Sequence, residues 1–512
     1  MEENRSLWQE ESLPDFPVLE GDTETEVLII GGGLCGILTA YTLLEKGIRA
    51  TVIEAEEIGG GVTARTTGKV TAQHGFFCRR LTAGLGEGLA RQYAAANRRG
   101  MERLMQLAEN EAAGCDFERL DSYAYVRDPD NAALAREEAE AALLLGFEAE
   151  WVRETELPFS VAGAVCFHSQ GMFHPLKFLN RLTAFLAKQG VRFYAHTRAL
   201  PPEGGLWRDG AVRTNRGVIG ARTILLCTHF PFLDKPGWYF ARIWQERTYL
   251  LALQDAPELK GMYIGYHKED DAYTFRPYRS PEGNGLLFGG RAHKTGHEAA
   301  EDHFGRLQQA ASSFYPGTRS VFQWSAQECM THDGIPYIGA YRRLSDRVFL
   351  ATGFNKWGMS SSMVAAELLA DAAVGEESPY SSVFSPGRFD PWLKGKSFFI
   401  QSTTMLADYI GGYFQLPKDS VEGLKKGQAR VVDWKGERVG VYRDDDDELY
   451  TVRAICTHLG CPLVWNTSEK TWDCPCHGSR YDIRGHILNT PASQPLAAGP
   501  DVLRASDEGG AE

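Results

Sequence analysis

The feature that most constrains this chain lies near its C-terminus, where two cysteines and two histidines recur in a fixed pattern. Cys456 and His458 form a Cys-x-His pair, fifteen residues follow, and Cys474 and His477 then form a Cys-x-x-His pair. Thiolates and imidazoles are ligands for both zinc and iron. Zinc ribbons and fingers group like ligands in pairs, whereas each segment here supplies one cysteine and one histidine. The pattern therefore favours an iron–sulfur cluster over a zinc site.

This ligand set is that of a Rieske [2Fe–2S] cluster, in which two cysteines hold one iron and two histidines hold the other. We assign Cys456 and Cys474 to the first iron, and His458 and His477 to the second. Replacing two thiolates by neutral imidazoles raises the reduction potential to roughly −150 to +300 mV. A cluster of this kind transfers single electrons, and we expect its two histidines to form the exposed edge that meets an electron carrier.

Four further residues lie beside these ligands. Cys461 and Cys476, one in each segment, could form a disulfide that joins the two loops. The hydroxyls of Ser479 and Tyr481 could donate hydrogen bonds to sulfur atoms, which tunes the potential of such clusters. With these residues, the C-terminal part resembles the Rieske domains of quinol-oxidising cytochrome complexes, which carry the same disulfide, serine and tyrosine. The resemblance implies an all-β Rieske domain over residues 418–505, with an external one-electron acceptor or quinone as its partner.

Near the N-terminus, a glycine-rich turn joins an apolar strand to a helix. Gly31, Gly33 and Gly36 form G-x-G-x-x-G directly after the strand at 26–30, and Glu54 ends a second apolar strand. In dinucleotide-binding folds these glycines allow the tight turn, the approach of the pyrophosphate and close helix–strand packing, and the acid accepts from ribose hydroxyls. An acid at this position disfavours the 2′-phosphate of NADP. The pattern predicts a Rossmann-like α/β domain that binds FAD or NAD.

Two segments favour FAD over NAD. Residues 56–75 are rich in glycine, threonine and arginine, which suits a long loop beneath a flavin. A second strand–turn–helix unit is predicted at 348–373, and its helix N-terminus could face the N1–C2=O edge of the ring, where positive dipole stabilises reduced flavin. We therefore expect further cofactor contacts from Thr63, Thr66, Thr67, Gly353, Gly358 and Met359.

These segments resemble the D-amino-acid oxidase family of FAD enzymes. The matching pieces are VLIIGGGLCGILTAY at 27–41, THDGIPYIG at 331–339 and ATGFNKWGMS at 351–360. The resemblance implies an FAD-binding domain interleaved with a β-sheet substrate domain over residues 23–390, after an N-terminal tail at 1–22. Residues 391–417 are expected to form a connecting helix. Cys329 lies near the position where some sarcosine oxidases attach flavin covalently, but the local spacing differs here.

The resemblance also directs the search for catalytic residues. Enzymes of this family oxidise a C–N or C–O bond by hydride transfer to flavin, and they depend on positioning and charge recognition. The candidates are Arg276, Tyr273 and His332. Arg276 could bind a carboxylate bidentately or form a structural salt bridge, and His332 could equally be an ordinary loop histidine. Tyr249 and Lys356 are further substrate-side or flavin-side candidates.

Charge and hydropathy bear on where the protein is found and on which classes of partner it binds. The net charge of −13 argues against nucleic acid as a partner, and no apolar run is long enough for a transmembrane segment. The N-terminus lacks the pattern of a secretory signal, so we expect a cytoplasmic protein, in which a disulfide would be unusual.

The combined expectation is an FAD-dependent oxidoreductase with two redox centres. It would oxidise a small amine, amino acid or hydroxy acid and pass electrons singly from flavin to the Rieske cluster and on to an external acceptor. Two alternatives stay open. One is a reductase with reversed electron flow, and the other is a redox relay whose cluster exchanges electrons with a partner protein.

Overall fold

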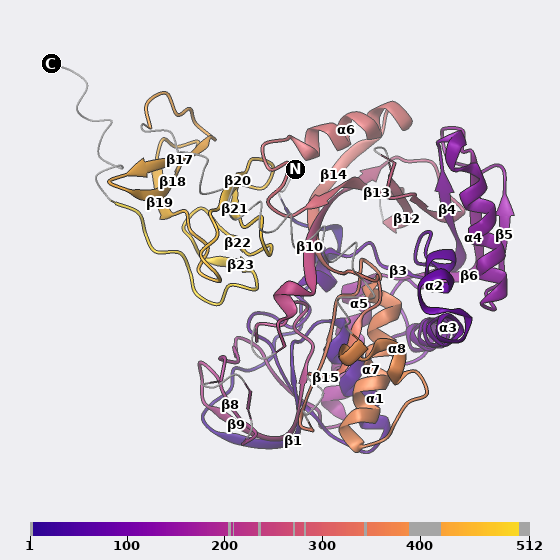
Figure 1. The fold of residues 1–512 in the computed structure, drawn as a ribbon, viewed down its shortest axis with the longest axis horizontal. Coiled ribbons are helices and arrows are strands. Elements are labelled where there is room, and N and C mark those ends of the chain that lie inside the picture. The colour runs from indigo at the N-terminus through magenta and orange to yellow at the C-terminus, as the bar shows by residue number, and fades with distance from the viewer. Residues whose placement is uncertain are drawn as a thin grey trace.

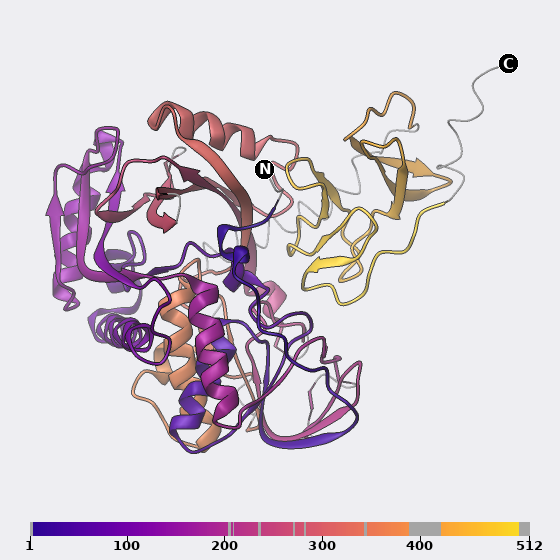
Figure 2. The ribbon, with the colours of Figure 1, turned by 180° about the vertical axis from the view of Figure 1, so that it is seen from behind.

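The structure is a computed structural model that describes residues 4–202, 206–207, 209–233, 237–269, 272–280, 283–341, 346–388 and 421–500. It contains a largely parallel sheet, a larger mixed sheet and a C-terminal β domain, which lies beside the mixed sheet in both views (Figures 1 and 2). The connecting helix expected at 391–417 lies outside the described residues.

The largely parallel sheet is the Rossmann-like part of the fold, as the sequence predicts. Its strand order is β15-β16-β9-β1-β2-β7, with β8 paired to β9, and only β15 and β8 run antiparallel to their neighbours. The strands are β1 (Thr23–Ile30), β2 (Thr51–Ile53), β7 (Arg192–Tyr194), β8 (Ala211–Arg213), β9 (Val218–Leu226), β15 (Tyr337–Ala340) and β16 (Val348–Thr352).

Two buried helices pack together against this sheet. α1 (Leu34–Glu45) and α7 (Gly358–Val374) contact each other. Neighbouring elements cover most of the circumference of both helices, which agrees with their largely apolar sequences. Other helices in this part are α5 (Pro175–Lys188), α8 (Ser381–Phe384), η2 (Val62–Arg65), η4 (Tyr239–Ala241) and η5 (Pro386–Arg388).

The mixed sheet has nine strands in the order β14-β10-β13-β12-β11-β4-β6-β3, with β5 paired to β6. Its segments alternate along the chain with those of the first sheet, which confirms the interleaved architecture. The strands are β3 (Lys69–Val70), β4 (Glu118–Val126), β5 (Ala149–Val152), β6 (Gly163–Met172), β10 (Ile243–Gln254), β11 (Gly261–Gly265), β12 (Thr274–Ser280), β13 (Gly283–Lys294) and β14 (Arg319–Thr331).

Two consecutive helices lie at the edge of the mixed sheet. They are α2 (Cys78–Leu85) and α3 (Glu87–Glu109), and Gly86 between them adopts a left-handed φ of 76°. The remaining helices of this part are η3 (Pro129–Asn131), α4 (Ala132–Leu144) and α6 (His303–Phe314).

The C-terminal domain is all-β in the described residues, as expected. A three-stranded sheet contains β17 (Ala429–Trp434), β18 (Glu437–Arg443) and β19 (Leu449–Arg453). A four-stranded sheet contains β20 (Val464–Asn466), β21 (Thr471–Asp473), β22 (Arg480–Tyr481) and β23 (Ile487–Asn489), and it lies nearer the rest of the molecule (Figure 1).

The N-terminal segment is part of the folded structure rather than a separate tail. Trp8, in η1 (Leu7–Glu10), is buried and donates from Nε1 to the carbonyl of Thr66 at 2.6 Å. Ser6 donates from Oγ to the carbonyl of Ala64 at 2.5 Å. These bonds hold the loop that the sequence assigns to the flavin.

Candidate functional site: two redox centres across one pair of strands

The dinucleotide turn has the geometry that its glycines predict. Gly31 has a φ of 114°, and a Cβ there would lie 2.4 Å from the carbonyl oxygen of Cys227. A Cβ on Gly36 would lie 2.0 Å from the carbonyl oxygen of Gly31. Gly33 is the N-cap of α1, where the positive end of the helix dipole can stabilise a phosphate.

The residues around this turn are placed to contact a dinucleotide. The Glu54 carboxylate, at the end of β2, accepts from the amides of Gly32 at 2.8 Å and Glu56 at 3.1 Å. Thr63 accepts through Oγ1 from the amide of Leu34, the first residue of α1, at 3.0 Å. Thr66 and Thr67 follow η2 and are half-buried. The glycine cradle and this loop fit the adenosine and pyrophosphate of FAD.

The second strand–turn–helix unit also forms as predicted. Gly353 follows β16 with a φ of 74°, Gly358 begins α7, and Met359 is buried beside it. Asn355 and Lys356 both have positive φ values, of 52° and 71°. The side-chain oxygen of Asn355 accepts from the amide of Thr331 at 2.7 Å, which ties this turn to the end of β14.

The four predicted cluster ligands come together in the C-terminal domain. The imidazole rings of His458 and His477 lie 5.0 Å apart, and the Cys456 and Cys474 thiols are close enough to interact. Both ring nitrogens of His477 are buried without a hydrogen-bond partner, as expected of a residue that binds a metal ion. Burial, together with His458 and Lys294, lowers the pKa of His477 to about 3, so its imidazole is neutral. This donor set fits a Rieske cluster.

The residues next to the ligands agree in part with the prediction. The Tyr481 hydroxyl lies 3.4 Å from Sγ of Cys456, as expected for a hydrogen bond to a ligand sulfur. Ser479 accepts through Oγ from the amide of Ala492 at 3.0 Å. Sγ of Cys461 and of Cys476 both lie within 4.8 Å of Sγ of Cys474, but the predicted Cys461–Cys476 disulfide is not formed in this structure and stays a prediction.

The histidine edge of the cluster site faces the FAD-binding part of the same chain. Phe240, in η4, places its ring centroid 5.7 Å from that of His458 and 5.3 Å from that of His477, edge-on to both. His477 is only 4% exposed, whereas His458 is half-buried. The expectation that both histidines form an exposed edge is therefore wrong for His477, because Phe240 covers it.

Two glutamines fix this contact by hydrogen bonds to the backbone of the cluster loops. Gln245 of β10 donates from Nε2 to the carbonyls of His477 at 2.8 Å and Thr490 at 2.9 Å. Gln327 of β14 donates from Nε2 to the carbonyl of Gly478 at 2.8 Å and to Oε1 of Gln245. No sequence motif identifies these glutamines, since each lies alone in a strand.

A buried ion-pair network continues the interface. Arg247 of β10 donates to the Glu469 carboxylate and to Ser325 of β14. Arg480 lies 3.0 Å from Glu469 and 3.0 Å from Asp473. Burial alone would raise the pKa of Glu469, but the two arginines outweigh it and lower this pKa to about 2. Glu469 is therefore an ionised carboxylate between the two parts of the molecule: its Oε1 contacts Arg247, Arg480 and Ser325, and its Oε2 is buried without a hydrogen-bond partner among the described residues.

The opposite face of the same strands carries a second charged cluster. Glu246 lies directly opposite Glu328 in the β10–β14 register, and its carboxylate is 3.0 Å from Nζ of Lys356, in the turn before α7. Burial raises the pKa of Glu328 to about 7, although Lys356 opposes the shift. This cluster connects β10 and β14 to the turn predicted to contact flavin, and Lys356 is its one member that the sequence pattern indicates.

The structure does not bring the three catalytic candidates together. Tyr273 and Arg276 are three positions apart in and before β12, so they point to opposite faces of the sheet. Arg276 donates from Nη2 to the carbonyl of Phe173 at 2.9 Å and lies over the Trp8 ring, while Tyr273 packs against Phe288.

The other candidates also separate. His332 follows β14, with its ring 5.3 Å from Trp244 and its Nε2 3.4 Å from the carbonyl oxygen of Ala241. It therefore lies beside η4 and far from the contacts of Arg276. Tyr249 stacks on His303 at 4.6 Å, under α6 and on the side of the strands that faces the C-terminal domain. The prediction of Tyr249 as a substrate-side residue is therefore wrong.

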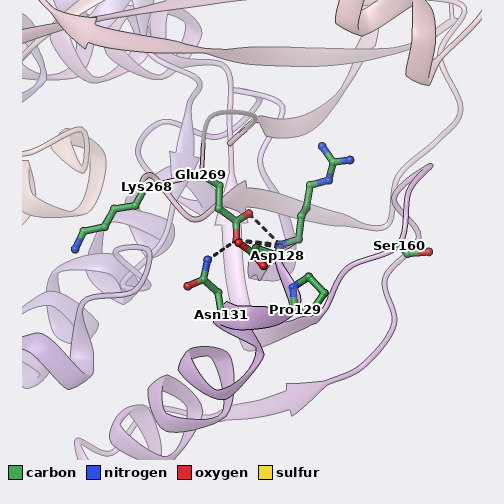
Figure 3. Close-up of a pocket in the computed structure, with 7 residues that line it drawn as sticks. Asp128, Pro129, Asn131, Ser160, Lys268 and Glu269 are labelled. Carbon is green, nitrogen blue, oxygen red and sulfur yellow. Dashed lines mark hydrogen bonds between the residues drawn. The ribbon is translucent and has the colours of Figure 1, made fainter.

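A separate polar pocket of about 560 Å³ lies at the end of β4, lined by Arg127, Asp128, Pro129, Asn131, Ser160, Lys268 and Glu269 (Figure 3). The Glu269 carboxylate accepts from the amide of Arg127 at 3.0 Å and from Nδ2 of Asn131 at 2.9 Å (Figure 3). None of the predicted cofactor residues lines this pocket. Its carboxylate is already occupied by these donors, so we assign it no role in the redox chemistry.

Comparison with known proteins agrees with this geometry. Residues 26–372 match the family described as FAD dependent oxidoreductase, and residues 415–500 match the Rieske [2Fe-2S] domain. The chain is 37% identical over 489 residues to YhfW of Bacillus subtilis (strain 168), which is named as a Rieske 2Fe-2S iron-sulfur protein; the match covers 94% of this chain and 95% of that protein. Over 93 residues the chain is also 42% identical to the cytochrome b6-f complex iron-sulfur subunit of Synechococcus elongatus; this match covers 18% of this chain and 48% of that protein.

Two solved structures of distant sequence illustrate the similarity of fold. Glycine oxidase from Geobacillus kaustophilus has a TM-score of 0.58 at 18% identity, covering 72% of this chain and 99% of its own. L-amino acid deaminase from Proteus vulgaris has a TM-score of 0.57 at 15% identity, covering 74% of this chain and 100% of its own. Across the part of the chain that the structure describes, no helix has the length and hydropathy of a membrane span. The chain therefore belongs to the FAD dependent oxidoreductase family and joins an FAD-binding enzyme fold to a C-terminal Rieske domain that binds a [2Fe–2S] cluster.

Proposed function

We propose that this enzyme is a dehydrogenase: a small amine, amino acid or hydroxy acid is oxidised in the FAD-binding part, and the electrons leave singly through the Rieske domain to an external acceptor. Bound FAD supplies a two-electron acceptor, and the cluster supplies a one-electron acceptor. The observation that carries this proposal is the placement of two consecutive residues of β10. Gln245 binds the cluster loop, and Glu246 binds Lys356 in the turn before α7.

Phe240 gives the second support. Its ring lies edge-on to both histidine ligands, and the neighbouring carbonyl of Ala241 is 3.4 Å from Nε2 of His332 in the THDG segment. The cluster edge is thus in van der Waals contact with the FAD-binding part of its own chain. Electron transfer between the two sites can occur within one molecule without a separate carrier.

The charged cluster on the other face of β10 and β14 supplies groups for substrate binding and proton transfer. An amine must be neutral before it can lose hydride, so a nearby group has to accept its proton. Glu328 is suited to this role because burial raises its pKa to about 7, which is near the pH of most enzyme reactions. Lys356 and Glu246 form a partly buried ion pair beside it, and this pair can orient an acidic or an amino group of the substrate.

The test is anaerobic mixing of the purified enzyme with a panel of amines, amino acids and hydroxy acids. Flavin bleaching is followed by absorbance, and cluster reduction by electron paramagnetic resonance. We expect at least one compound to bleach the flavin first and reduce the cluster afterwards, at a rate independent of protein concentration. In Phe240→Ala the cluster should be reduced at least tenfold more slowly while flavin bleaching keeps its rate.

A matched control is Phe232→Ala, because Phe232 is also a partly buried phenylalanine but contacts neither histidine. This variant should behave as the wild type. If no compound bleaches the flavin, while a reduced partner protein reduces the cluster, the chain is the redox relay of the alternative hypothesis. If the cluster transfers electrons to flavin and a bound substrate is reduced, the flow is reversed.

A further inference from the structure

A group of metal-ligating side chains lies at the edge of the mixed sheet, outside both cofactor sites. Asp121 of β4 and the pair Cys166 and His168 of β6 meet there. Nδ1 of His168 is 3.1 Å from Oδ2 of Asp121, and Sγ of Cys166 is 3.7 Å from the same nitrogen and 3.8 Å from the same oxygen. One sulfur, one nitrogen and one oxygen thus surround a single point.

The strand geometry explains why these atoms converge. Cys166 and His168 are two positions apart in β6, so both point to the same face of the sheet. A register shift in the β4–β6 pairing between Leu120 and Ser122 places Asp121 beside them. The amide of Ser169 donates to the other oxygen of Asp121 at 3.1 Å, which holds this carboxylate with Oδ2 directed at the cysteine and the histidine.

The separations match those of a tetrahedral metal site. Zinc, with Zn–S of about 2.3 Å and Zn–N and Zn–O of about 2.0–2.1 Å, places its sulfur about 3.6 Å from nitrogen or oxygen ligands, and nitrogen about 3.3 Å from oxygen. The observed distances of 3.7, 3.8 and 3.1 Å lie within a few tenths of an ångström of these values. We propose that Asp121, Cys166 and His168 form a zinc site that is independent of the redox centres.

The surroundings of the histidine support this assignment. Nε2 of His168, the nitrogen that faces away from the group, is 3.4 Å from a carboxylate oxygen of Glu150 in β5. Histidines that bind zinc usually donate through their second nitrogen to a carboxylate, which fixes the ring. Cys166 is 1% exposed, whereas the side chains of Asp121 and His168 are 35% and 39% exposed. The thiol is therefore buried, and the carboxylate and imidazole are partly accessible to solvent, which can supply a water as a fourth ligand.

The donor set also selects the class of ion. Calcium and magnesium take oxygen ligands, whereas a thiolate with an imidazole and one carboxylate suits zinc. Because zinc binds the thiolate rather than the thiol, binding must release the thiol proton, and the affinity should rise as the pH rises.

The experiment uses the full-length protein with both cofactors bound. The protein is treated with a mild chelator that leaves the cluster iron in place, and zinc chloride is then added at increasing concentrations. Bound zinc is measured by elemental analysis after gel filtration, and the unfolding temperature is recorded in parallel. We expect one zinc ion per chain and a higher unfolding temperature with zinc.

Three variants and a matched control decide the assignment. Cys166→Ser and Asp121→Asn should each lose the zinc, and Asp121→Asn is the safer variant because its side chain is partly exposed. Glu150→Gln should weaken binding about ten- to a hundredfold by freeing the histidine ring. His486→Ala removes an ordinary His–Asp pair, 2.9 Å from Asp482, and should keep the zinc. Zinc that binds equally to all four variants, or that does not stay on the wild type, would overturn the proposal.

Discussion

The two faces of the β10–β14 strand pair carry ion pairs of opposite character. On the face toward the Rieske domain, the side chains of Arg247 and Glu469 are 3% and 4% exposed. On the face toward the turn before α7, the side chains of Lys356 and Glu246 are 28% and 25% exposed. One ion pair is sealed between two parts of the protein, and the other is only partly buried.

This difference indicates different roles for the two faces. Burying an ion pair removes the water around both charges, and Oε1 of Glu469 has Arg247, Arg480 and Ser325 as partners in its place. Such a network fixes the position of the Rieske domain. A partly exposed pair can exchange partners with a ligand at less cost than a buried one. The sealed face therefore sets geometry, and the open face is available for chemistry.

The largest effect should come from breaking the sealed face. In Arg247→Met, the buried Glu469 carboxylate loses one of its two positively charged partners. We expect the free energy of unfolding to fall by on the order of 3 kcal/mol. It is measured by urea unfolding, with separate probes for flavin and cluster. Arg91→Met is the control, because Arg91 pairs with Glu87 on the surface, and that pair contributes less than about 0.5 kcal/mol. Equal losses in the two variants would show that the interface network is not sealed.

The open face should respond in catalysis rather than in stability. Glu328 has a pKa raised to about 7, so it is protonated below that pH and can accept a proton only above it. In the wild type, kcat/KM should therefore fall as the pH drops below about 7. Glu328→Gln should lower kcat/KM about a hundredfold and remove this pH dependence.

Glu258→Gln is the matched control for this prediction. Glu258 pairs with Arg279 on the surface, with both side chains more than half exposed. It should leave the pH profile unchanged. A Glu328→Gln variant that retains the fall in kcat/KM near pH 7 would assign the proton acceptor to another group.

The smallest effect should come from removing one hydrogen-bonding side chain of the sealed face. Gln245→Leu loses the bonds to the carbonyls of His477 and Thr490, so the cluster loop should shift slightly from its position. We expect cluster reduction to slow about tenfold, or about 1.4 kcal/mol, with a change in the resonance spectrum of the cluster. Gln254→Leu, on the same strand but bonded to Arg319, should leave both unchanged. Identical spectra and rates in the two variants would contradict the positioning role of Gln245.

The parts of the site that lie within one short segment could be predicted from the sequence. The cluster ligands occupy two loops, and the dinucleotide turn occupies one strand–turn–helix unit. The spacing of residues within these short segments is therefore enough to indicate both sites. The predicted unit at 348–373 likewise begins with a strand, β16, at residues 348–352, because an apolar run followed by a glycine-rich turn is a local signal. Tyr481 was also identified correctly as a neighbour of a ligand sulfur, because its distance along the chain from the ligands is small.

The contacts between the two halves could not be predicted in this way. Gln245 and His477 are 232 positions apart, and a single glutamine in a strand has the pattern of a solvent-facing residue. The catalytic candidates Arg276 and Tyr273 lie on opposite faces of the sheet, because a spacing of three residues in a strand directs side chains to opposite sides. Glu328 was missed since its raised pKa arises from tertiary burial, which no local pattern indicates.

The adjacency of Gln245 and Glu246 has a practical consequence. A peptide unit in the middle of a sheet is stiff, so a compound that displaces Glu246 from Lys356 also pulls on the amide that anchors the cluster loop. Binding of a ligand near Glu246 should therefore change the magnetic spectrum of the cluster on the other side of the sheet. Screening compounds by their effect on its magnetic spectrum could identify ligands that never react at all.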